Sequence, residues 1–212
     1  MSNQATVFVA ECWAALRRDP LGTLNRWQDQ RAIWLVGGLV ALAMELIAYF
    51  YFQTFLAMAP CELCVYIRFS MTVIFLGGML VAIAPKNAIL RAIGYIVIGY
   101  GVFKGWEWCI RLEMTHHMMQ ALEAGGDLFA AGGGAGACST EPSFPFGLPL
   151  HVWFPSTFLP TGLCGEDSWR FLSLNMAEWL MIVYAVYTVL LAAMLLAWAL
   201  KGRSTAKPAA QN

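Results

Sequence analysis

Pro60-Cys61-Glu62-Leu63-Cys64 leads without a break into the apolar run 65–84, and this junction decides how the chain is interpreted. The run has the ~20 residues that a helix needs to cross a hydrocarbon layer about 30 Å thick. Outside a membrane, two cysteines at this spacing usually bind zinc or form a redox-active turn. At the mouth of a membrane helix, two thiols can instead exchange electrons with a molecule dissolved in the lipid.

The composition of the whole chain is that of an integral membrane protein. Of its 212 residues, 59% are hydrophobic and 12% are charged, whereas a soluble domain carries about 25% charged residues. The formal net charge is zero and basic residues are not interleaved with aromatic ones, so no nucleic-acid partner is indicated. The segment before the first apolar run lacks a continuous apolar core, so we expect that run to act as an uncleaved signal.

Four apolar runs predict an all-α integral membrane fold, a four-transmembrane-helix bundle, because only helices or closed barrels satisfy the backbone in lipid. The single membrane domain 1–212 has its predicted spans at about 32–52, 65–84, 89–108 and 176–200. One long loop covers about 109–175. Its first part, 111–124, has apolar residues at helical spacing and predicts an amphipathic helix lying on the bilayer.

The flanks of the spans differ in basic residues. Nine Lys and Arg residues lie on one side and three on the other. Because cytoplasmic flanks are enriched in these residues, both termini are expected in the cytoplasm. The two cysteines at 61 and 64 and the long loop then face an oxidising compartment, which is the periplasm if the host is a bacterium.

The first cysteine pair has the surroundings of a reactive site. Pro60 suits the beginning of a helix, so Cys61 and Cys64 are expected in the first turn, where the electropositive helix end favours thiolate over thiol. Arg68 follows one turn deeper on the same face. It can stabilise a Cys64 thiolate or the oxyanion of a reduced acceptor, or it can simply extend to the lipid headgroups.

Cys138 and Cys164 bracket the proline-rich part of the long loop and form the second candidate pair. Taken alone, they indicate a structural disulfide. On the same side of the membrane as a reactive pair, they also suit a relay by thiol–disulfide exchange. Zinc is disfavoured because structural sites normally have two tight cysteine pairs, and haem attachment is excluded because Val65 follows Cys64.

Five other residues carry weaker signals. Glu45 lies in the middle of the first span and either moves protons or is a protonated carboxyl between helices. His116, followed by His117, lies near the outer end of the third span, where it either meets a quinone headgroup or is solvated. Cys12 and Cys109 have no obvious partner.

These motifs together resemble the DsbB-type disulfide oxidoreductases of the bacterial inner membrane. The resemblance covers nearly the whole chain and is carried by the residues that follow: the cysteine pair that opens the second span, Val65-Tyr66-Ile67-Arg68, Glu45, a histidine before Met118-Met119-Gln120, the loop cysteines, and Phe-Leu-Ser-Leu-Asn-Met-Ala-Glu-Trp-Leu at 171–180. The segments 26–31, 59–62, 138–142 and 160–165 look more like the DsbI branch. Members of that branch have a longer insert after the last loop cysteine, which this chain lacks.

The resemblance implies a mechanism. A reduced thioredoxin-fold protein of the periplasm, DsbA- or DsbL-like, would attack the Cys138–Cys164 disulfide at Cys138. Cys164 would be paired again through Cys61, and Cys64 would face a ubiquinone or menaquinone. Arg68 and His116 would stabilise the quinone, and membrane lipid would surround the helices.

Two other functions stay open from the sequence. The first is a membrane anchor with a structural loop disulfide and an incidental cysteine pair. The second is a relative of the vitamin K epoxide reductases, which also use four helices but carry their cysteine pair late in the bundle.

Overall fold

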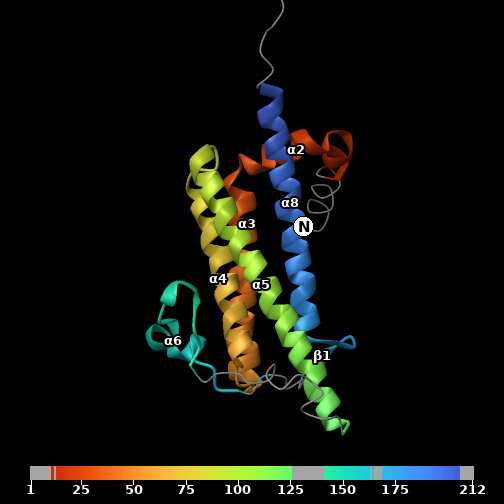
Figure 1. The fold of residues 1–212 in the computed structure, drawn as a ribbon. Helices are drawn as coiled ribbons and strands as arrows, with labels where there is room; N and C mark the ends of the chain where they lie inside the picture. The colour runs from red at the N-terminus through yellow and green to blue at the C-terminus, as the bar shows by residue number, and fades with distance from the viewer. Residues whose placement is uncertain (1–10, 12, 126–140, 163, 165–168, 206–212) are drawn as a thin grey trace, which may run out of the picture.

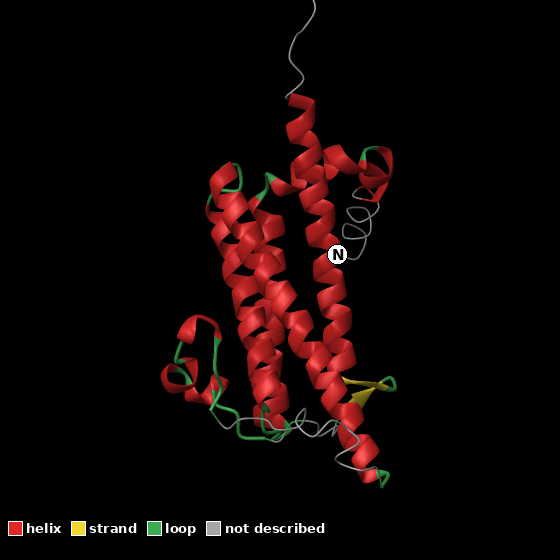
Figure 2. Cartoon of the chain, viewed as in Figure 1, coloured by secondary structure: helices red, strands yellow, loops and turns green. Residues whose placement is uncertain are grey.

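The computed structural model describes residues 11, 13–125, 141–162, 164 and 169–205. Within these residues the chain is almost entirely helical (Figures 1 and 2). The elements in chain order are α2 (Pro20–Gln28), α3 (Arg31–Leu46), the π-helix η1 (Ile47–Phe55), α4 (Glu62–Ile83), α5 (Ala88–Glu123), the 3₁₀ turn η2 (Pro145–Gly147), α6 (Leu150–Trp153), α7 (Pro155–Phe158), β1 (Arg170–Phe171), β2 (Leu174–Asn175) and α8 (Met176–Thr205).

Four of these helical segments are long and apolar enough to cross a membrane, as the sequence predicts. They are Arg31–Phe55, Glu62–Ile83, Ala88–Ala121 and Met176–Leu200. They run side by side as a bundle, with α2 across one end and α6 beside the other end (Figure 1). The described chain is therefore an all-α, four-helix membrane protein, and the limits of the bilayer along each helix stay a prediction.

Small residues let the first two long helices approach closely. An ideal Cβ atom placed on Gly78 of α4 would lie 3.1 Å from the Cα atom of Gly38 on α3. Without a hydrophobic drive between helices in lipid, close backbone packing of this kind is a main source of helix association. It holds α3 against α4 and so sets the position of the π-helix that continues α3.

The third long helix differs from the prediction. The segment 111–124, expected as a separate helix on the bilayer surface, continues the third span as the single helix α5. No proline or glycine interrupts the chain between Trp106 and Ala124. Leu112 and His116, one turn apart, are buried in the protein, so the apolar side of this segment packs into the bundle.

The end of the bundle opposite α2 carries the connections that complete the site. The short helices α6 and α7 lie beside the lower part of α4, and the hairpin β1–β2 lies beside the start of α8 (Figures 1 and 2). The hairpin pairs Arg170 with Asn175 and Phe171 with Leu174 in antiparallel register. Trp179 donates a 3.0 Å hydrogen bond to the Phe171 carbonyl, which fixes the hairpin to α8.

Candidate functional site

A cavity of about 440 Å³ lies at this end of the bundle, between all four long helices. Its walls are mostly apolar, with Met and aliphatic side chains from every helix. The polar side chains on its lining are few, and they include Glu45, Cys61, Cys64, Arg68 and His116. Binding cavities typically combine an apolar lining with a few placed polar groups. The cavity therefore fits a largely apolar molecule with polar atoms at its edge.

Cys61 and Cys64 form a disulfide on the wall of this cavity, and their Cα atoms are 5.1 Å apart. The helix begins one residue later than the sequence predicts. Cys61 is not in the first turn but is the N-cap of α4, and its sulfur accepts a 3.2 Å hydrogen bond from the backbone N–H of Cys64. A cysteine sulfur here takes the position of the usual capping oxygen. Cys61 is buried and Cys64 is half-buried.

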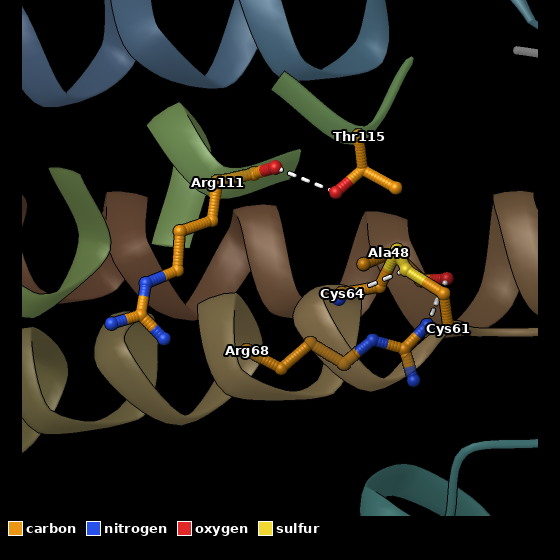
Figure 3. The surroundings of a disulfide bond; sticks show 6 residues. All are labelled: Ala48, Cys61, Cys64, Arg68, Arg111 and Thr115. Carbon is orange, nitrogen blue, oxygen red and sulfur yellow. Dashed lines mark hydrogen bonds between the residues drawn. A yellow bond between two sulfur atoms is a disulfide. The ribbon is translucent and has the colours of Figure 1, made fainter. Parts of the chain in front are cut away.

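The Arg68 guanidinium runs back along α4 toward the disulfide (Figure 3), as side chains on a helix do. It is only 6% exposed. Its N–H groups donate to Gln53 Oε1 at 2.7 Å and to the carbonyls of Thr157 at 3.1 Å and Ala48 at 3.1 Å. Arg68 therefore does not extend to the headgroups. It joins η1 and α7 at the edge of the cavity, and its role in a reaction stays a prediction.

Gln53 is a site residue that the sequence did not reveal. Besides accepting from Arg68, its side chain donates a 2.8 Å hydrogen bond to the Ser156 carbonyl of α7. The only signal was one amide within an aromatic run, Tyr49 to Phe55. The π-helical turn itself had no signal in the sequence, although such turns are often found at functional sites.

The two adjacent histidines face opposite ways. His116 is 4% exposed and lies on the cavity wall, whereas the His117 side chain is 72% exposed. Glu113 lies near both of them, with its Oε2 atom 3.8 Å from His116 Nδ1 and its Oε1 atom 3.0 Å from His117 Nε2. Of the two candidates, His116 is thus placed where a bound molecule could meet it.

The last loop cysteine is held close to the first pair by backbone hydrogen bonds. The N–H groups of Thr161 and Gly162 both donate to the Pro60 carbonyl, at 2.9 and 3.0 Å. A Cβ atom on Gly162 would collide with the carbonyl of Ala59. Cys164 is buried in the same core cluster as Cys61, and it is disulfide-bonded. We name residues 161–162 together with Pro60 the loop clamp.

Cys138 and Cys12 lie outside the described residues, so the predicted Cys138–Cys164 pairing stays a prediction. Cys109 is a free thiol, fully buried on α5. No group of three His, Cys, Asp or Glu side chains in the described part of the chain is arranged to hold a metal ion, and the expectation of a metal-free site stays a prediction.

These features define the class of the protein, a multi-pass α-helical membrane protein with a disulfide beside an apolar cavity. Comparison with known proteins then gives the family. Residues 30–194 match the family described as "Disulfide bond formation protein DsbB". The chain therefore belongs to the DsbB family and is a membrane protein-disulfide oxidoreductase. Proteins of this family are multi-pass proteins of the bacterial inner membrane, and this localisation holds for the chain too.

The similar curated proteins carry the DsbI name. A Shewanella oneidensis protein, provisionally named as protein-disulfide oxidoreductase DsbI, is 45% identical over 195 residues, covering 90% of this chain and 91% of the relative. A Campylobacter fetus protein with the same provisional name is 40% identical, covering 90% and 98%. The protein-disulfide oxidoreductase DsbI of Escherichia coli O1:K1 is 38% identical, covering 89% and 96%. The resemblance to the DsbI branch is thus confirmed.

Proposed function

We propose that this protein reoxidises a periplasmic thioredoxin-fold dithiol protein, DsbA- or DsbL-like, and passes the electrons to a membrane quinone, ubiquinone or menaquinone. One observation carries the proposal. The Cys61–Cys64 disulfide lies on the wall of an apolar cavity between membrane helices, with Arg68 and His116 on the same lining. A thiol pair in that position can reach an electron acceptor dissolved in lipid.

The residues of the cavity fit a quinone. Its volume of about 440 Å³ is within the range of small-molecule sites, about 300–1,000 Å³. Apolar side chains such as Met71, Leu112 and Val183 suit the ring. His116 and Arg68 carry the polar atoms that suit its oxygens. A bound quinone would accept two electrons and two protons and leave as quinol.

The four cysteines would carry the electrons by thiol–disulfide exchange. A thiolate of the partner attacks the Cys138 sulfur and displaces Cys164 as a thiolate. The second partner thiol then releases Cys138, which leaves the partner oxidised. Cys164 attacks Cys61 and displaces Cys64, and Cys138 closes the loop disulfide again. Cys61 and Cys64 now hold two electrons, which they lose to the acceptor as their disulfide reforms.

The loop clamp would serve the third of these exchanges. It holds the chain just before Cys164 against the residue just before Cys61, through the Pro60 carbonyl. Exchange between disulfides needs contact between the sulfurs, so a fixed position of the attacking cysteine, Cys164, would raise the rate. The hydrogen bond from the Cys64 N–H to the Cys61 sulfur would favour the Cys61 thiolate, which is displaced when Cys138 closes the loop disulfide again.

We also propose that both termini lie in the cytoplasm and the redox loops in the periplasm. The basic flanks support this orientation. Arg26 belongs to α2, and Arg91 near the start of α5 pairs with Asp29 just after α2. The cysteine pair lies at the start of α4, at the other end of the bundle (Figure 1).

The test is quinone reduction by the purified protein. With a reduced thioredoxin-fold partner, the ultraviolet absorbance of added quinone should fall, and Cys64→Ala should abolish this turnover. Normal turnover in Cys64→Ala contradicts the proposal. Cys164→Ser leaves Cys138 as a free thiol, so with the oxidised partner it should accumulate a mixed disulfide: the Cys138 thiolate attacks the partner disulfide and displaces one partner thiolate. Non-reducing gels and mass spectrometry detect this species. A mere membrane anchor would instead show a cysteine alkylation pattern that does not change when respiration stops.

A further inference from the structure

Glu45, on α3 near the start of the π-helix, has an unusual environment. Its carboxyl group lies on the lining of the cavity that also contains Cys61 and Cys64. Both of its oxygens are buried, and neither makes a hydrogen bond to any residue that the structure describes. A buried polar atom without a partner is rare in proteins and needs an explanation.

Several other carboxyl groups in the described residues are bonded. Their partners are Arg91 for Asp29, Lys104 and Arg111 for Glu107, Asn175 for Glu113, and the Asn175 N–H for Glu178. Glu45 is also not paired with the cation nearest to it in the cavity. Arg68 lies within electrostatic range of Glu45, but its N–H groups donate to Gln53, Thr157 and Ala48.

The surroundings of Glu45 leave its carboxyl group available to a molecule bound in the cavity. Around it, α4 contributes Arg68, α5 contributes His116 and α8 contributes only apolar and tryptophan side chains to the cavity lining. A buried carboxyl without a hydrogen bond is unfavourable, and it is more so when it is charged. A ligand oxygen that exchanges a proton with this carboxyl would supply the missing partner.

We propose that Glu45 is the proton-transfer residue for the acceptor bound in this cavity, an inference that rests on the proposed quinone reduction. As the Cys61–Cys64 disulfide forms, the two sulfurs lose two electrons and two protons. The acceptor gains two electrons and two protons. Glu45 donates one of these protons to an acceptor oxygen and takes up one of the thiol protons, so its own protonation is the same before and after turnover.

The first test compares Glu45→Gln with the control Glu107→Gln, which removes a carboxyl on α5 that does not line the cavity. Positioned acid–base groups contribute about 10²–10⁴-fold to a rate, so Glu45→Gln should lower kcat for quinone reduction at least ~100-fold. The KM for a short-chain ubiquinone should change little, and reduction of the Cys61–Cys64 disulfide by the partner should stay at the wild-type rate. Glu107→Gln should behave as wild type.

The outcomes separate the two proposals. If wild-type protein does not reduce quinone, the proposed function fails. If wild type turns over and Glu45→Gln keeps its kcat, or only raises KM, the role of Glu45 in proton transfer is overturned. Glu45→Asp should recover part of the lost kcat, which a purely structural carboxyl would not do when its chain is shortened.

A second measurement needs no variant to fold. Dicyclohexylcarbodiimide modifies protonated carboxyl groups in apolar surroundings, and mass spectrometry of wild-type protein in membranes locates the label. Labelling is expected at Glu45 and not at Glu107, and excess short-chain ubiquinone should reduce it at least ~10-fold. No label at Glu45, or labelling that ubiquinone does not reduce, contradicts the proposal.

Discussion

The sulfur of Cys61 accepts a hydrogen bond from the backbone N–H of Cys64, with 3.2 Å between the two atoms, and the same two residues are joined by a disulfide. One cysteine thus caps the helix whose first turn carries the other. Redox change at this pair therefore occurs on a helix end that has a donor for the sulfur of Cys61.

The capping role can be separated from the redox role by two substitutions. Cys61→Ser and Cys61→Ala both remove the disulfide, so both should abolish quinone reduction. Serine can still accept the Cys64 N–H, and alanine cannot, so Cys61→Ala should be less stable than Cys61→Ser by about 1 kcal/mol. Denaturant unfolding in detergent measures this difference. Equal stabilities would show that the sulfur does not act as a cap.

The loop clamp should control exchange between the two disulfides. Gly162→Ala introduces a Cβ atom that collides with the Ala59 carbonyl, so it should push the chain before Cys164 away from Pro60. Because a misplacement of about 1 Å can cost up to 10²-fold in rate, reduction of Cys61–Cys64 by the partner should slow at least ~10-fold. Rapid-quench alkylation follows this step.

The matched control for this prediction is Gly37→Ala. A Cβ atom on Gly37 meets no atom within 4 Å, so the rate should stay at the wild-type value. Direct reduction of Cys61–Cys64 by a small dithiol should be unchanged in both variants. Slowing of that direct reaction in Gly162→Ala would mean that the first pair itself is distorted.

Arg68 should be needed as an arginine, not only as a positive charge. Its guanidinium donates to three acceptors from η1 and α7, and a lysine ammonium cannot reproduce this planar set of donors. Arg68→Lys should therefore raise the KM for quinone by about 10-fold, which initial rates at varied quinone concentration measure.

Arg111→Lys is the control for Arg68→Lys. The Arg111 side chain is 62% exposed, pairs with Glu107 and points away from the disulfide (Figure 3), so its replacement should leave the KM unchanged. If Arg68→Lys also leaves the KM for quinone unchanged, Arg68 only holds the loop in place and does not contribute to quinone binding.

Cys109 should take no part in electron transfer. It is a fully buried free thiol on α5 and is absent from the cavity lining. Cys109→Ala should keep the wild-type turnover and lose about 1–2 kcal/mol of stability from the removed buried atom. In folded wild-type membranes, a maleimide should not modify Cys109. If maleimide modifies Cys109 without denaturant, or if Cys109→Ala loses turnover, this prediction is wrong and Cys109 takes part in the reaction.

Much of the fold could be predicted because hydropathy acts locally. A run of about 20 apolar residues must cross the bilayer as a helix whatever the rest of the chain does. The same logic placed Cys61 and Cys64 at a helix start and Arg68 one turn below. The predicted start of the second helix was wrong by one residue. Cys61 caps the helix from outside its first turn, because its sulfur accepts a hydrogen bond that residue spacing does not specify.

The rest depended on contacts between distant segments. The helix α5 continues through 111–123, and the face of this segment that carries Leu112 and His116 is buried against the rest of the bundle. Local sequence does not specify which neighbours cover that face. The partners of Arg68 are more telling: Thr157 lies 89 residues from it in sequence, and Gln53 lies 15 away across a turn. No local pattern encodes such pairs.

The sequence by itself determined a four-helix membrane protein with a cysteine pair at the start of the second span, and it determined the family. It did so because bilayer thickness and helix periodicity translate directly into runs and spacings of residues. Only the tertiary structure decided that Glu45, Arg68, His116 and the cysteine pair share one cavity, and that the Glu45 carboxyl makes no hydrogen bond to a described residue. The physical reason is that burial and hydrogen bonding depend on how separate helices pack against one another.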